Sequence, residues 1–282
     1  TSISVLSWLI SRKVGKLFLI DHTSMSKRYI NFDLNINTLL VKIIMRLTYP
    51  LANSIITVSK GVRNNISNLS GISKKNIKVI YNPIEKIKLK KEENIKINST
   101  KLFGNFDYKI LGVGTLKPSK DFSTLIKAFA IVKNKINASL VIIGEGEEYS
   151  KLKLLINKLK LNKFVKLRGF QKNPYKWFRS ADLYVHSSLY DGLPLVIIEA
   201  MSCGLPILST NCDSGPSELL ANGKYGKLIP LGNQHIMARE ILKILKQKYN
   251  KSKRNQLIER SKKFSIETIS DNYIKHFFKD KL

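Results

Sequence analysis

Cysteine and histidine are both scarce in this chain of 282 residues, which contains two cysteines and four histidines. Two cysteines, Cys203 and Cys212, are too few for a disulfide framework in a chain of this length, so we expect reduced thiols in a cytoplasmic compartment. The histidines and cysteines do not show the close spacing that metal ligands have in sequence. The sequence therefore predicts no metal and no other cofactor.

Long apolar runs are also missing. The longest, such as residues 17 to 20 and 193 to 198, fall far below the roughly 20 residues that a membrane-spanning helix needs. The first segment, residues 3 to 20, is interrupted by charged residues and predicts a short helix followed by a buried strand. With 43% hydrophobic residues and 15 glycines, the chain is expected to form one large or two modest globular domains.

Acidic residues are few: 20 Asp and Glu stand against 49 Lys and Arg, and the net charge is +29. Such a charge gives any protein some affinity for nucleic acid at low salt. However, the charge is spread along the whole chain, and no nucleic-acid-binding motif accompanies it. We expect no specific nucleic-acid partner. Peripheral attraction to an anionic membrane surface is one use of this charge, and a plainly solvated surface is the other.

The stretch from residue 186 to residue 206, HSSLYDGLPLVIIEAMSCGLP, has the pattern of a strand end, a tight turn and a helix. Gly192 permits the turn, and Pro194 suits the first residue of the helix, which Gly204 would end. The unpaired N–H groups and the dipole of a helix start stabilise a phosphate or diphosphate. The carboxylates of Asp191 and Glu199 could then bind sugar or ribose hydroxyls, or they could simply be solvated.

Four further segments accompany this one: GVGTLKPSKDFSTLIKAFAIV (112 to 132), LVIIGEGEE (140 to 148), VKLRGFQKNPYKWFRSADLYVHSS (165 to 188) and STNCDSGPSELLANGKYGKLIPLGN (209 to 233). Together, and in this order, the five segments resemble the nucleotide-sugar domain of the retaining glycosyltransferase family 4, the group 1 glycosyltransferases with their E-x7-E signature. The resemblance implies an α/β protein of the GT-B fold, with two Rossmann-like domains built on parallel sheets.

The resemblance also implies roles for residues of the turn and its surroundings. Glu199 would hold the ribose of the nucleotide, and Asp191, shorter by one methylene than the usual Glu, would contact the transferred sugar. The backbone of the turn would face the sugar and diphosphate, and a second group would lie beside the base. The turn group is Gly192, Leu193, Pro194 and Leu195, and the base group is Arg168, Gly169 and Phe170. A plain core position is the other reading of Phe170.

In this family two cationic side chains stabilise the negative charge of the leaving diphosphate. One is an Arg after the first strand of the domain, and the other is a Lys five residues later. Here Lys120 matches the Lys, but Thr115 follows Gly114 at the Arg position. A Thr hydroxyl can donate a hydrogen bond to phosphate without neutralising it. Lys117, in the same loop, either compensates or is a solvated lysine.

Two histidines lie at predicted strand ends. His22 matches the N-domain histidine that in relatives faces the donor sugar across the cleft, and a strand-end histidine without a role is the alternative. His186 precedes the turn of Asp191, and we interpret it as a core residue. The predicted catalytic residues are therefore Lys120, Asp191, Glu199 and His22.

The pattern along the chain predicts four parts. They are a partial N-terminal acceptor-side domain (1 to 85), a charged linker (86 to 105), a C-terminal nucleotide-sugar domain (106 to 258) and a C-terminal helix that crosses back to the N-terminal domain (259 to 282). Compared with the family, the N-terminal domain resembles only the later strands. We expect its first strands to be absent from this chain or supplied by a separate chain.

The function implied is transfer of a sugar, with retention and without a metal, from a nucleotide-sugar donor, a UDP-sugar by preference. The acceptor would be a glycan or lipid-linked sugar in surface-polysaccharide or glycolipid assembly, at the cytoplasmic face of the membrane. Two alternatives stay open. One is a non-catalytic remnant or split-enzyme subunit that only binds the donor, and the other is a nucleotide-sugar epimerase of the same fold.

Overall fold

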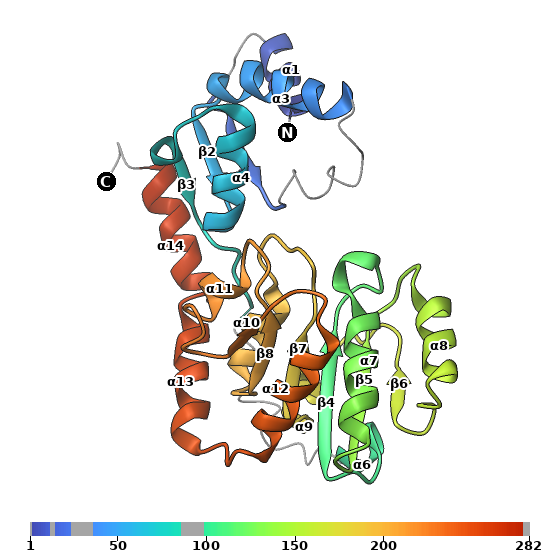
Figure 1. Cartoon of the computed structure of the whole chain (residues 1–282). Coiled ribbons are helices and arrows are strands. Elements are labelled where there is room, and N and C mark those ends of the chain that lie inside the picture. The colour runs from blue at the N-terminus through green and yellow to red at the C-terminus, as the bar shows by residue number, and fades with distance from the viewer. Residues whose placement is uncertain (1, 12–14, 24–35, 86–98, 279–282) are drawn as a thin grey trace.

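The computed structural model describes residues 2 to 11, 15 to 23, 36 to 85 and 99 to 278. Two parallel sheets organise these residues, one in each half of the molecule (Figure 1). The N-terminal sheet has the strand order β1-β2-β3, and the C-terminal sheet has the order β6-β5-β4-β7-β8-β9. Both sheets are wholly parallel, as the sequence predicts.

The N-terminal part alternates helices and short strands. Its elements are α1 (Ser2–Ile10), β1 (Phe18–Asp21), α3 (Ile36–Thr48), η1 (Tyr49–Leu51), β2 (Ser54–Thr57), α4 (Lys60–Ser70), η2 (Lys74–Asn76) and β3 (Ile77–Val79). Helix α4 begins where the side chain of Ser59 accepts a hydrogen bond from the backbone N–H of Val62, and it ends at Gly71 in the left-handed conformation.

The C-terminal part repeats the strand and helix alternation more fully. Its strands are β4 (Tyr108–Val113), β5 (Ala138–Ile143), β6 (Val165–Leu167), β7 (Leu183–His186), β8 (Ile207–Thr210) and β9 (Lys227–Ile229). Its helices are α6 (Ser99–Phe103), η3 (Pro118–Lys120), α7 (Phe122–Lys133), α8 (Tyr149–Lys158), α9 (Tyr175–Ser180), α10 (Leu195–Ser202), α11 (Pro216–Leu219) and α12 (Gln234–Lys246). Every residue of β5 is buried, as expected for a strand covered by helices on both faces.

Two last helices connect the parts. Helix α13 (Lys251–Lys262) contacts α10 in the C-terminal part, and α14 (Ile266–Phe277) lies along the N-terminal sheet (Figure 1). On α14, Ile269 packs in a cluster with buried residues of β2 and its neighbours, and the ring of Phe277 lies 4.5 Å from that of Phe18. The chain therefore crosses back onto its N-terminal half through α14.

Two predicted boundaries need correction. The last residues of the predicted linker, 86 to 105, form helix α6, whose Phe103 is buried against Trp177, so these residues belong to the C-terminal core. Residues 86 to 98 lie outside the described residues. The predicted crossing helix, 259 to 282, starts inside α13, and only α14 reaches the N-terminal sheet. The remaining domain boundaries stay predictions.

Helix α3 presents an apolar face to solvent. Its Met45 is buried, whereas Leu39 is 62% and Leu47 68% exposed. Leu40, Ile43 and Ile44 on the same helix are also exposed. No helix among the described residues has the length and apolar character to cross a bilayer.

Candidate donor site

The predicted site lies where the carboxyl ends of β4 and β7 meet the start of helix α10. Strand β7 ends at His186, the turn carries Asp191, and α10 begins at Leu195. Pro194 is the residue before the helix and not its first helical residue, which corrects the prediction by one position. The turn brings Asp191 to Lys120, which ends η3 after β4.

The ammonium of Lys120 and the carboxylate of Asp191 form an ion pair, with Nζ 2.5 Å from Oδ2. Both side chains are largely buried, at 15% and 18% exposure. Burial raises the pKa of the Asp191 carboxyl, but His186 and the positive charge of Lys120 outweigh burial and hold that pKa well below its usual range. Asp191 is therefore an anion at neutral pH.

Glu199 lies on α10, and its environment differs from that of Asp191. Burial raises the pKa of its carboxyl to about 7. Among the described residues, none donates a hydrogen bond to this carboxylate or pairs with it. A carboxylate that is buried and unpaired has acceptor capacity free for the hydroxyl groups of a ligand.

A cavity of about 290 Å³ opens between the loops that follow β4, β5 and β6. Its walls include Gly114, Thr115, Glu145 and Phe170. The loops come close because Gly144 has a positive φ of 137° and no side chain; a Cβ there would lie 1.9 Å from the carbonyl oxygen of Gly114.

The predicted base group surrounds this cavity only in part. Phe170 lines it and is 70% exposed, which rules out a core position for its ring. The backbone N–H of Phe170 donates to Oε1 of Glu145, 3.1 Å away, and Gly169 adopts a positive φ of 64°. The side chain of Arg168 is exposed at the edge of the same loop and is not part of the cavity wall.

His22 reaches the site from the N-terminal part. Gly192 approaches the backbone of His22 so closely that a Cβ at position 192 would lie 2.1 Å from the His22 carbonyl oxygen. The imidazole of His22 is exposed, and its Nδ1 atom lies 3.3 Å from Nδ2 of Asn82. The structure thus brings His22, Lys120, Asp191 and the 192 to 195 turn together, with Glu199 on the helix that follows.

A second contact between the two parts involves Glu218, which the sequence did not single out. Its carboxylate accepts hydrogen bonds from the backbone N–H groups of Lys60 (2.8 Å) and Gly61 (2.9 Å) at the start of α4. The hydroxyl of Tyr81 donates to the same carboxylate at 3.2 Å. An acidic group at a helix N-terminus is stabilised by the unpaired N–H groups and the dipole, so Glu218 holds the two parts together.

Sequence reasoning also missed polar residues that fix the turn. The hydroxyl of Ser187 donates to the carbonyl of Lys120 at 2.6 Å, and the hydroxyl of Ser214 donates to the carbonyl of Asp191. His186, interpreted as a core residue, is buried, but its ring points toward Asp191, with Nε2 3.5 Å from Oδ2. The position of His186 at a polar strand end, five residues before Asp191, was the available signal.

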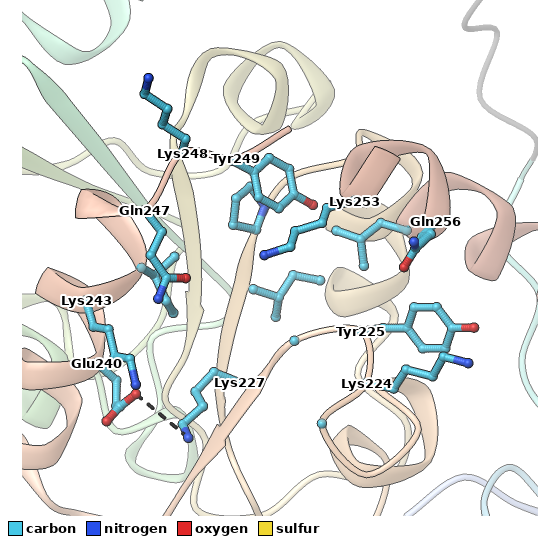
Figure 2. Close-up of a pocket in the computed structure, with 16 residues that line it drawn as sticks. Lys224, Tyr225, Lys227, Glu240, Lys243, Gln247, Lys248, Tyr249, Lys253 and Gln256 are labelled. Carbon is cyan, nitrogen blue, oxygen red and sulfur yellow. Dashed lines mark ion pairs between the residues drawn. The ribbon is translucent and has the colours of Figure 1, made fainter. Parts of the chain in front are cut away.

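A separate cavity of about 380 Å³ lies near the amino ends of β8 and β9, between α12 and α13 (Figure 2). Lys253 and Gln247 point into it, Lys248 points away, and Lys227 pairs with Glu240 at 3.8 Å. We call it the lysine pocket. None of the predicted site residues lines it. In the part of the chain that the structure describes, no group of acidic, His or Cys side chains could hold a metal ion.

Comparisons with known proteins identify the family and the fold. Residues 93 to 264 match the family model "Glycosyl transferases group 1", and residues 2 to 86 match "Glycosyltransferase Family 4". A curated relative from Campylobacter jejuni, N-acetylgalactosamine-N,N'-diacetylbacillosaminyl-diphospho-undecaprenol 4-alpha-N-acetylgalactosaminyltransferase, is 31% identical over 86% of this chain and 64% of its own length. An uncharacterised glycosyltransferase of Methanocaldococcus jannaschii is 31% identical over 78% of this chain and 62% of its own length.

Solved structures share the fold. HepE of Anabaena, crystallised with UDP, superposes with a TM-score of 0.80 at 21% identity over 98% of this chain and 75% of that one. TarM superposes with a TM-score of 0.72 at 26% identity, over 94% of this chain and 51% of that one. The chain therefore spans less than two thirds of the two curated relatives and three quarters or less of these two structures.

Proposed function

This chain belongs to the group 1 glycosyltransferases with the GT-B fold, and we propose that it transfers a sugar from a nucleotide-sugar donor to a glycan or lipid-linked acceptor. One observation carries the proposal: the ion pair of Lys120 and Asp191 lies at the turn that starts α10, the helix of Glu199. The pair and the unpaired Glu199 carboxylate provide complementary groups for a diphosphate, a sugar and a ribose.

Each group of the donor has a partner in this arrangement. The turn and the start of α10 receive the diphosphate. Pro194 has no N–H and the N–H of Gly192 donates to Asp191, so the donors are the N–H groups of Leu193 and of the first residues of α10. Lys120 neutralises the charge that develops as the diphosphate leaves. Glu199 accepts hydrogen bonds from the ribose hydroxyls, and Asp191 accepts them from the transferred sugar.

The base lies in the cavity of about 290 Å³ beside Gly114, Thr115 and Phe170, with Gly169 and Arg168 at its edge. The exposed ring of Phe170 offers a surface on which a base can stack. UDP is the nucleotide we propose, and the UDP, UDP-glucose and glucose complexes of HepE support this choice by likeness of fold. We propose transfer with retention from the resemblance to retaining glycosyltransferases. It needs no metal, because Lys120 and the helix start supply the positive potential on the diphosphate.

The acceptor is proposed to be a glycan or lipid-linked sugar of surface-polysaccharide or glycolipid assembly. The name of the Campylobacter jejuni relative specifies a diphospho-undecaprenol acceptor, and that of an Erwinia amylovora relative, 29% identical over 63% of this chain, specifies amylovoran biosynthesis. Such an acceptor would place the reaction at the cytoplasmic face of the membrane.

Peripheral attachment to that membrane has its support in the charge around α12 and α13. Residues 239 to 263 hold ten Lys and Arg against two Glu, and the lysine pocket lies among them (Figure 2). Each basic residue near an anionic bilayer contributes about 1 kcal/mol of attraction. Vesicles containing phosphatidylglycerol should sediment the chain, whereas neutral phosphatidylcholine vesicles should leave it in the supernatant.

A second candidate function is donor binding without transfer, as one subunit of a split enzyme. The exposed apolar residues of α3 favour it, because five large apolar side chains exposed together on one helix are commonly a contact for another polypeptide. In that case the chain binds UDP but transfers sugar only when a partner polypeptide covers α3. His22 would still face the donor.

The test is a transfer assay with UDP-glucose, UDP-galactose and their N-acetyl derivatives, with and without a lipid extract as acceptor. Release of UDP together with a labelled lipid supports transfer. Interconversion of the UDP-sugars without acceptor identifies an epimerase. Binding of UDP with neither product identifies the donor-binding subunit, and Glu199→Ala should abolish whichever signal is seen.

A further inference from the structure

Strand β7 carries two polar rings on one face, because residues two apart on a strand point the same way. Tyr184 is completely buried, and its hydroxyl lies 3.1 Å from Nδ1 of His186. His186 is 2% exposed, and β7 is an inner strand, paired with β4 and β8. Buried polar groups need partners, so these two rings determine which hydrogen bonds the site can form.

The contact between the rings fixes the position of the imidazole proton. Burial, with Asp191 and Glu199 nearby, raises the pKa of Tyr184 well above its usual value, so its hydroxyl keeps a proton that it can donate to Nδ1. The Asp191 carboxylate beside Nε2 favours this direction, because it attracts the imidazole proton to Nε2. Burial lowers the pKa of His186, which keeps the ring neutral at pH 7. A neutral imidazole whose Nδ1 accepts carries its proton on Nε2.

That Nε2–H group points at Asp191. Nε2 is 3.5 Å from Oδ2 of Asp191 and has no shorter hydrogen bond among the described residues. Asp191 has two other contacts: Lys120 on Oδ2 and the backbone N–H of Gly192 on Oδ1 at 3.1 Å. Because Lys120 carries the positive charge among these contacts, it is the one that an anionic diphosphate would compete for.

We propose that His186 is a positioning residue that holds the Asp191 carboxylate in place when the diphosphate of the donor draws Lys120 away. The proposal rests on the proposed function, since it assigns Lys120 to the diphosphate and Asp191 to the transferred sugar. Tyr184 fixes the His186 tautomer, His186 directs a proton donor at Oδ2, and Asp191 keeps the orientation in which it can accept from sugar hydroxyls. The long Nε2–Oδ2 contact shortens as Lys120 leaves.

The first arm of the test needs no donor. Long-range ¹⁵N–¹H correlation spectra of the histidine rings distinguish the two neutral tautomers, and the His186 signal is identified by its loss in His186→Gln. We expect the proton on Nε2 at pH 7. Asp191→Asn should lower the pKa of His186 and Lys120→Gln should raise it, because these are the nearest charged groups. A proton on Nδ1, or a His186 pKa that neither variant changes, would overturn the proposal.

The second arm uses the ratio of affinity for each UDP-sugar to affinity for UDP. His186→Leu should reduce this ratio about tenfold for the preferred sugar, the effect of one hydrogen bond to a charged group. Binding of UDP itself should not change. His186→Gln, which keeps an N–H donor, should restore much of the ratio. An unchanged ratio in His186→Leu for all four sugars of the transfer assay would also overturn the proposal.

The two arms separate this proposal from the proposed function. If the wild-type chain binds no UDP, the proposed function fails, and the tautomer and the two pKa changes still decide whether His186 holds Asp191. Thermal unfolding of each variant checks that the buried substitutions leave the chain folded. The wild-type tautomer needs no substitution at all.

Discussion

The two sheets of the molecule differ in how completely they are covered. The C-terminal sheet has six strands, with β5 buried at every residue and helices packed on both faces. The N-terminal sheet has three strands in the described residues, and its helix α3 leaves Leu39 and Leu47 largely in solvent. The donor-side residues Lys120, Asp191 and Glu199 all lie in the well-covered part.

This difference suggests how the work of the protein is divided. The C-terminal part holds the ion pair, the turn and the cavity of about 290 Å³ with its own loops, so in the proposed function donor binding depends mainly on this part. The N-terminal part contributes His22 and the start of α4, which Glu218 joins to the C-terminal part. Its helix α3 leaves an apolar face in solvent, which in the second candidate function is the contact for a partner polypeptide.

The largest effect should come from the cores themselves. Phe129 is fully buried on α7. Phe129→Ala should lower the free energy of unfolding by about 3 to 5 kcal/mol, because the surrounding side chains cannot fill the cavity that it leaves. Leu47→Ser on α3 should change that free energy by less than about 0.5 kcal/mol. Urea unfolding measures both. A large loss in Leu47→Ser would mean that the α3 face is not a free surface.

Lys120→Gln should weaken UDP binding by about 30- to 100-fold, the effect of removing a charge-assisted contact to phosphate. The matched control is Lys253→Gln in the lysine pocket, which removes the same charge from the same part of the chain (Figure 2). The control should bind UDP as the wild type does. Equal losses in both variants would show that UDP responds only to overall charge.

Glu218→Ala should loosen the contact between the two parts. The substitution removes the carboxylate that accepts from the N–H groups of Lys60 and Gly61. An acceptor of this kind at a helix start stabilises the helix by about 1 to 2 kcal/mol. Hydrogen exchange of these two amides should therefore accelerate about tenfold or more, while amides of β5 keep their protection. Unchanged exchange at residues 60 and 61 would contradict the proposed contact.

The pH dependence of UDP binding should reveal Glu199. Its carboxyl pKa is raised to about 7, so the ionised form that accepts from ribose hydroxyls predominates only above that pH. Affinity for UDP should rise by up to about tenfold between pH 6 and pH 8, because the ionised fraction of a carboxyl with this pKa rises about tenfold over that range. UDP has an ionisation of its own in this range, so Glu199→Gln is the control. It should lose the Glu199 component and keep that of UDP.

The sequence predicted parallel sheets correctly, and in the C-terminal sheet the apolar strands β4, β5 and β6 each lead into a glycine-containing loop. The fold and the family were both predicted from five ordered motifs. The end of the linker was misread because the run from residue 85 is charged, whereas Phe103 contributes to the core only through contact with Trp177, far along the chain.

The partners within the site were harder to predict. Sequence spacing indicated Asp191 and Glu199, but it could not show that Asp191 pairs with Lys120, or that Glu199 has no partner, since both depend on how loops from different strands meet. His186 and Glu218 were missed for the same reason. His186 contacts Asp191 across the turn, and Glu218 contacts Gly61, which is distant in sequence.

Calorimetric titration with UDP in about 0.15 M salt, where surface charge is screened, tests the central claim most directly. The wild-type chain and Glu199→Ala are titrated with UDP, and a short RNA serves as a polyanion control. The account predicts that UDP binds the wild type, that Glu199→Ala abolishes this binding, and that RNA does not compete. Absence of UDP binding, or equal binding by the wild type and Glu199→Ala, would contradict the assignment of a donor site to the C-terminal part.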